Sequence, residues 1–110
     1  MPRVAVWDDS DDMTPQKMEI ILRHWADFRE LYEATGVDEL QLGKKIIVNI
    51  HDILQDIVLL PKRQREAIQL TCLQGLREID AAKIMGLAGR SSPVGAYKRL
   101  GLKKLASRWH

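Results

Sequence analysis

Cysteine is almost absent from this 110-residue chain, which contains a single one, Cys72. A lone thiol cannot form an internal disulfide, and no cysteine and histidine residues have the spacing of a zinc site. The chain also lacks any apolar run near the ~18 residues that a membrane helix needs. Its first twelve residues hold four aspartates and no apolar stretch of the kind found in secretory signals. We therefore expect a reducing cytoplasmic compartment, no metal and no cofactor.

Catalytic motifs are missing as well. The sequence has no phosphate-binding loop and no readable Ser/His/Asp or Cys/His set, and its three histidines are scattered. What is present is an ordinary globular balance of 45% hydrophobic and 29% charged residues, which excludes wholesale disorder. The length suits one domain. The sequence therefore predicts a small binding domain and not an enzyme.

The net charge of +2 hides two opposite halves. Residues 1–60 contain 6 Lys/Arg and 12 Asp/Glu, a net charge of −6, whereas residues 61–110 contain 11 Lys/Arg and 3 Asp/Glu, a net charge of +8. A basic segment of this kind points to a polyanion, most often nucleic acid. The alternative is that the two halves neutralise each other. We expect an acidic half and a basic half with different partners, divided at Pro61.

Apolar spacing predicts an all-α fold, a five-helix bundle with no confident strand. Residues 1–12 are expected to be a disordered acidic N-terminus, and residues 13–60 an acidic segment of two helices. Residues 61–110 are expected to form a basic helix-turn-helix segment. The order of elements therefore places the charge and the predicted binding motif in the same half of the chain.

Residues typical of helix ends mark the two helices expected in the acidic segment. Thr14 is a typical cap, Pro15 suits the first helical position, and Gly36 is where this helix is expected to end. Asp38 resembles the start of a second helix, because a glutamine follows it at capping-box spacing. The β-branched run at 46–48 is also compatible with a strand.

In the basic segment, two short helices joined by a glycine-bearing turn precede a basic helix, which is typical of a helix-turn-helix. Ala81 and Ala82 are small enough for close packing between the helices. The segment from Arg90 to Arg108 contains six cations and no acid. The predicted helices run over 62–74, ending at Gly75, over 77–85, ending at Gly86, and over 93–108, with Ser92 as its cap and Pro93 first.

The basic half resembles region four of bacterial sigma factors. The resemblance rests on the run from Leu60 to Glu66, Leu-Pro-Lys-Arg-Gln-Arg-Glu, and on Gly75-Leu76, Ala82, Ile84-Met85-Gly86 and Leu102-Lys103-Lys104-Leu105. It implies a last helix that reads a promoter element and another face that contacts the flap of RNA polymerase. Because the first 60 residues are acidic and differ from a melting region, we expect a solitary regulator, as in phages and mobile elements. Three positions depart from the family pattern: Arg77, Ala81 and Gly95.

The predicted helix and the resemblance together suggest a set of DNA-contacting residues. At the helix start, Arg90, Ser91 and Ser92 are expected to hold a phosphate. Lys98 is expected to donate to guanine, and Val94 or Ala96 to touch a thymine methyl group. For Val94 and Tyr97, packing in the core is an equal alternative. The remaining expected contacts are with phosphates: Arg99, Lys103 and Lys104 and, by resemblance, Arg63 and Gln64 on the preceding helix.

Three other functions stay open at this point. The chain is alternatively a protein-interaction module that binds RNA polymerase or a sigma factor without reading DNA. In a third version the acidic helices form a homodimer that presents two recognition helices to a palindrome. A phage packaging subunit with a similar DNA-binding domain is a minor alternative. The expected partners are therefore double-stranded DNA, RNA polymerase or a sigma factor, and a second copy of the chain.

Overall fold

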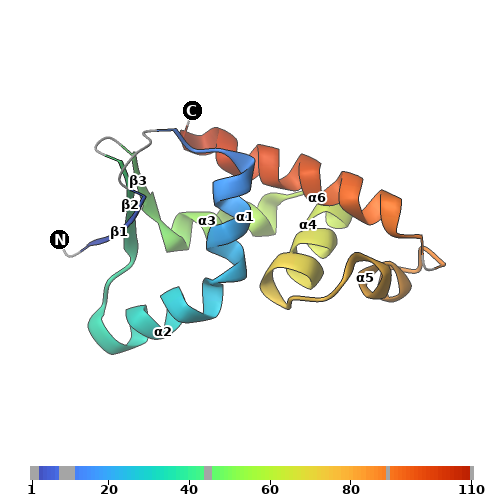
Figure 1. Ribbon diagram of the computed structural model, residues 1–110, viewed down its shortest axis with the longest axis horizontal. Helices are drawn as coiled ribbons and strands as arrows, with labels where there is room; N and C mark the ends of the chain where they lie inside the picture. Colours follow the sequence, from blue (N-terminus) through green and yellow to red (C-terminus); the bar gives the residue numbers. More distant parts are fainter. Residues whose placement is uncertain (1–2, 8–11, 44–45, 89, 110) are drawn as a thin grey trace.

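The computed structural model describes residues 3–7, 12–43, 46–88 and 90–109. Within them the chain is mostly helical, with a small sheet at one end (Figure 1). The predicted all-α class therefore holds for most of the chain and is wrong in leaving out strands. The six α-helices are α1 Pro15–Arg23, α2 Trp25–Thr35, α3 Ile50–Leu59, α4 Lys62–Ile68, α5 Glu78–Ile84 and α6 Ser91–Ala106.

The sheet contains three strands in the order β1-β2-β3. Strand β1 (Arg3–Trp7) runs parallel to β2 (Glu39–Leu42), which pairs antiparallel with β3 (Ile46–Asn49). The prediction of a disordered N-terminus is thus wrong for the five residues of β1, because their backbone pairs with a strand distant in sequence. Residues 1–2 and 8–11 of that prediction lie outside the described residues.

The first predicted helix is two helices in the structure. Its start is confirmed, since the Thr14 hydroxyl accepts a hydrogen bond from the Lys17 backbone N–H at 3.1 Å and Pro15 begins α1. At His24 the backbone leaves the helical region, with φ −100° and ψ 19°, and α2 starts at the next residue. Gly36 ends α2 in the left-handed conformation, with φ 76°. The continuous apolar stripe gave no sign of this break.

The second predicted helix is wrong over its first half, where the β2–β3 hairpin stands. Leu40 and Leu42 alternate with less buried neighbours, so one face of β2 packs on the core. Asp38 is not the cap; Asn49 is, and its side chain accepts from the His51 backbone N–H at 2.8 Å. The β-branched residues at 46–48 adopt the strand to which their side chains are suited.

The predicted boundaries in the basic half agree well with the structure. Gly75 and Gly86 follow α4 and α5 in left-handed conformations, with φ 74° and 75°. Helix α4 continues into a π-helical turn, Gln69–Leu73, and α6 into a 3₁₀ turn, Ser107–Trp109. Helix α6 begins two residues earlier than predicted, which places Pro93 third instead of first. This is still tolerated, because the first four N–H groups of a helix have no intrahelical partner.

Two apolar clusters hold the fold together. The larger one joins α1, the hairpin and α3 to the inner side of α4 and α6, so the acidic and basic halves share a core. The smaller one lies between α4, α5 and α6 and contains Ala81 and Ala82, both fully buried as their small size predicted. At Gly101 a Cβ atom would overlap Ile68 Cδ1, so glycine permits the close approach of α4 and α6. None of the described helices has the length and apolar character to cross a membrane.

Candidate nucleic-acid interface

Helix α6 lies along one edge of the molecule, with α1, α4 and α5 packed against it (Figure 1). Its inner side is buried and includes Gly95, Gly101, Leu102 and Leu105. Its outer side is open to solvent, and Leu100 on this side is 54% exposed. The exposed cations of the outer side are Arg99, Lys103 and Lys104.

The start of α6 is also exposed. Arg90, Ser91 and Ser92 are solvent-accessible, and no residue of α1 or α2 forms an ion pair with them among the described residues. Arg90 occupies the cap position, but its side chain makes no cap hydrogen bond, and the predicted cap Ser92 is the second residue of the helix. The first residues of α6, and with them the positive end of the helix, are therefore accessible to solvent, as an anion contact requires.

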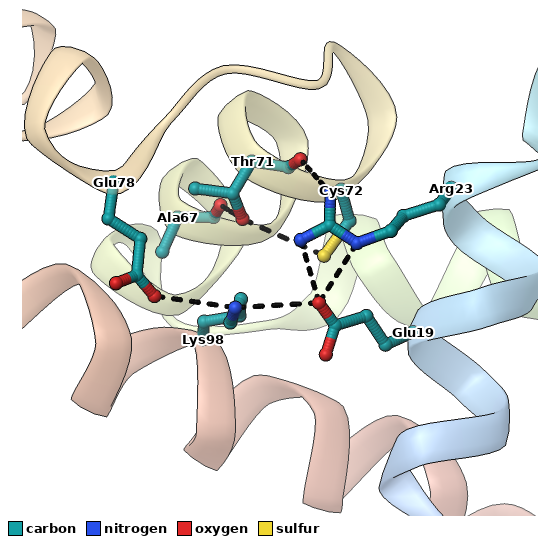
Figure 2. Close-up of polar contacts among 7 residues, drawn as sticks. All are labelled: Glu19, Arg23, Ala67, Thr71, Cys72, Glu78 and Lys98. Carbon is teal, nitrogen blue, oxygen red and sulfur yellow. Dashed lines mark hydrogen bonds and ion pairs between the residues drawn. The ribbon is translucent and has the colours of Figure 1, made fainter.

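Lys98 is placed differently from its neighbours on α6. Its side chain is 16% exposed, and its Nζ lies 3.4 Å from Glu19 Oε2 and 3.3 Å from Glu78 Oε1. Figure 2 shows the ammonium group between these two carboxylates, one from α1 and one from α5. In this conformation the Lys98 charge is already compensated inside the protein, which disfavours the predicted contact with guanine.

The Glu19 carboxylate extends this cluster to a fourth element. Arg23 donates to it from Nε and Nη2 at 3.0 and 2.7 Å, and from Nη1 to the Thr71 carbonyl at 3.2 Å (Figure 2). Burial alone would raise the pKa of Glu19, but the hydrogen bond from Arg23 and the charges of Lys98 and Arg23 outweigh it, so its pKa is lowered. The cluster thereby fixes α1, α5 and the π turn around α6.

Val94 and Tyr97 both pack against the core, the alternative to a base contact, but to different degrees. Val94 is fully buried in the smaller apolar cluster, and Tyr97 packs against that cluster while remaining partly exposed. The Val94 side chain therefore cannot touch a thymine methyl group in this conformation. Ala96 is partly exposed. Of the apolar side chains expected at bases, Ala96 is the one that solvent reaches.

The two predicted contacts on α4 are partly used within the protein. Arg63 donates from Nη1 to the Met85 carbonyl at 2.6 Å, which ties α4 to the end of α5, and its Nη1 lies 3.7 Å from Glu66. Gln64 is half-buried beside Gly101, and its Oε1 has no hydrogen-bond partner. It borders a groove of about 360 Å³, which is lined by Gln64, Leu100, Lys103, Lys104 and Ser107.

Ion pairs between the halves account for part of the opposite charges. Besides Lys98 and Glu19, Arg108 forms a two-pronged pair with Asp56, each N–O distance being 2.6 Å. Mutual neutralisation, the alternative stated for the charge pattern, is therefore realised at two places. Most of the basic charge remains uncompensated. The basic half contains eleven cations, and only four of them have an acidic partner within 4 Å. Among the described residues of the basic half, seven cations have no acidic partner within 4 Å: Lys62, Arg65, Lys83, Arg90, Arg99, Lys103 and Lys104.

Two features of this surface were not found from the sequence. Glu19 pairs with Lys98 across 79 positions, and no local pattern signals such a contact. The close approach at Gly101 does have a signal in the sequence, since a glycine inside a helix costs about 1 kcal/mol and needs a packing reason. The departure at Gly95 has a similar cause: a Cβ there would lie 3.3 Å from Glu78 Oε1.

Comparisons with protein-family models, with curated protein sequences and with solved structures give no match for this chain. The function is therefore argued from the geometry of α6 and the charges around it.

Proposed function

We propose that the protein is a DNA-binding transcription regulator that places α6 in the major groove of duplex DNA. The observation that carries the proposal is the outer side of α6, where Arg99, Lys103 and Lys104 are exposed and lack acidic partners among the described residues. A duplex offers a row of phosphates, and a helix of this size fits its major groove.

The arrangement of α5 and α6 supports the same function. The fully buried alanines of α5 let it pack closely on α6, and Gly86 begins the turn between them. In a helix-turn-helix the first helix braces the second against the core and the second carries the groove contacts. Here the cluster around Lys98 adds a brace from α1, so the side chains of the outer face are presented by a fixed helix. The resemblance to sigma region four, read from the sequence, agrees with this assignment.

Duplex binding by the triple variant R99A/K103A/K104A tests the proposal. We expect a fluorescently labelled mixed-sequence duplex to bind the wild type at low salt, and the variant to bind at least about tenfold more weakly, because three phosphate or base contacts are lost. Arg29→Ala, which removes an exposed cation of α2, serves as the control and is expected to bind as the wild type does. Equal affinity of the triple variant, or no binding by the wild type, contradicts the proposal.

A second candidate, a module that binds RNA polymerase or a sigma factor, is favoured by the end of α3. Val58 and Leu59 are 65% and 74% exposed there, although neighbouring residues of the helix are buried. Polar replacements V58S/L59S distinguish the two candidates. Retention of polymerase by the wild type that is lost in V58S/L59S, with no duplex binding by either protein, would support the module, whereas no retention of polymerase by the wild type would exclude it. Sedimentation at high concentration tests the homodimer version in the same samples.

A further inference from the structure

We propose that Arg99, and not its neighbour Lys98, is the residue that reads a base, and that the base is guanine. This inference rests on the proposed DNA-binding function and names the residue that gives it sequence preference. It reverses the expectation from the sequence, in which Lys98 reads guanine and Arg99 meets a phosphate. Along the first three turns of α6, most other side chains are buried, short or engaged within the protein, whereas Arg99 is long and exposed.

Elimination begins with the side chains that cannot leave the protein. Val94 is fully buried, and Gly95 has no side chain to offer. Lys98 is 16% exposed and holds two carboxylates, Glu19 and Glu78, at 3.4 and 3.3 Å. To reach a base it would have to leave both of them, and two carboxylates would then face the approaching phosphates without their shared cation.

The side chains that remain exposed in this part of α6 differ in reach. Ser91 and Ser92 are short and lie in the first turn, where the helix end attracts a phosphate. Ala96 has only a methyl group. Arg90 precedes the helix at the cap position. Tyr97 packs against the smaller apolar cluster and is only partly exposed. Arg99 is therefore the one long cationic donor exposed among the described α6 residues before Lys103.

Arg99 lies in the third turn of α6, but its guanidinium reaches back toward the earlier residues of the helix. A Cβ atom built on Gly95 would lie 3.5 Å from Arg99 Nη1 and 3.3 Å from Glu78 Oε1, so the exposed side chain runs back by one turn along the edge of α6 that borders α5, toward the start of the helix. Helical side chains tilt in this direction, and the first residues of a groove helix lie nearest the base edges. Glu78, the acid beside Gly95, is engaged by Lys98 and forms no ion pair within 4 Å with Arg99.

The chemistry of the group then selects the base. A guanidinium presents two parallel N–H donors, which match O6 and N7 of guanine in the major groove. A lysine ammonium at the same place keeps the charge and can also donate to guanine, but it lacks the planar pair of donors and so gives a weaker preference. Removal of a charged group that contacts only a phosphate would lower the affinity for every sequence alike, whereas removal of a base contact changes the preference at one position of the site.

The test is selection of bound duplexes from a random pool, carried out with the wild type, Arg99→Ala, Arg99→Lys and the control Lys103→Ala. We expect the wild type to enrich guanine at a defined position of its site. Arg99→Ala should lose that preference and Arg99→Lys should weaken it, with binding of the selected duplex weakened roughly 5- to 150-fold for Arg99→Ala. Lys103→Ala should weaken all duplexes alike and keep the preference. Far-ultraviolet circular dichroism verifies that each variant is folded.

The outcomes separate this inference from the proposed function. Arg99→Ala that still selects the same guanine overturns the inference, as does a wild type that binds duplexes in a salt-dependent manner without any sequence preference; both leave DNA binding itself in place. A guanine preference lost in Lys103→Ala but kept in Arg99→Ala would assign the reading to Lys103 and also overturn it. A wild type that binds no duplex at low salt removes the proposed function and the inference together.

Discussion

Lys98 and Arg99 are neighbours in the chain, yet their charges have different surroundings. Lys98 lies on the inner side of α6, between carboxylates from α1 and α5, whereas Arg99 lies on the outer side without an acidic partner within 4 Å among the described residues. One residue along a helix turns the side chain by about 100°, which is enough to separate the two environments. The inner cation holds the fold together, and the outer one is available to a partner.

The two glycines inside α6 also differ in their surroundings. Gly101 faces the buried Ile68, whereas Gly95 faces the end of the flexible Glu78 side chain. Both replacements by alanine gain about the same helix propensity, so their difference in unfolding free energy reports the packing. We expect Gly101→Ala to be less stable than Gly95→Ala by about 1–3 kcal/mol, because overpacking a core costs that amount. Thermal or urea unfolding measures it, and equal stability of the two variants would contradict the close approach of α4 and α6.

Replacing the two neighbouring cations is the next strongest test. We expect Lys98→Ala to lower the free energy of unfolding by about 1–2 kcal/mol, between the values for exposed and buried ion pairs, since two carboxylates lose their shared partner. Arg99→Ala is expected to stay within about 0.5 kcal/mol of the wild type, as is usual for an exposed side chain. Urea unfolding of both variants at low and high salt provides the comparison. A larger loss in Arg99→Ala than in Lys98→Ala would reverse the assignment of the two faces.

The carboxylate side of the cluster predicts a smaller effect that depends on pH. The pKa of Glu19 is lowered in the folded protein, so its charged form contributes stability above its ordinary value of 4.5, and this contribution is lost as pH falls through the lowered pKa. We expect Glu19→Gln to be less stable than the wild type at pH 7 and the difference to shrink below about pH 4.5. A difference that stays constant from pH 7 to pH 3 would show that Glu19 acts through packing instead of charge.

Much of the basic half could be predicted from the sequence, because its signals are local. Gly75 and Gly86 mark helix ends through a backbone conformation that favours glycine, and the apolar spacing between them leaves one interpretation. The structure of the acidic half is harder to predict from the sequence. The break at His24 interrupts an apolar stripe that continues in phase, and β1 depends on pairing with residues more than 30 positions away.

The candidate site was predictable only in its location. Its charge and its place on the last helix follow from composition, and the exposed Lys103 and Lys104 lie where the sequence placed them. Which side of α6 faces outward is decided by packing against three other helices, and a helix start misplaced by two residues leaves that side undefined. Lys98 and Val94 were therefore expected in contacts with bases, although the fold uses both of them on the inner side.

The salt dependence of duplex binding tests the central claim, that the outer side of α6 binds DNA, most directly. Each phosphate contact contributes about 0.9 to the slope of the logarithm of affinity against the logarithm of salt concentration. The account predicts that the slope is reduced by about 2 in K103A/K104A and unchanged in Arg29→Ala, which removes an exposed cation of α2. Equal slopes for the wild type and K103A/K104A, or a reduced slope in Arg29→Ala alone, would contradict it.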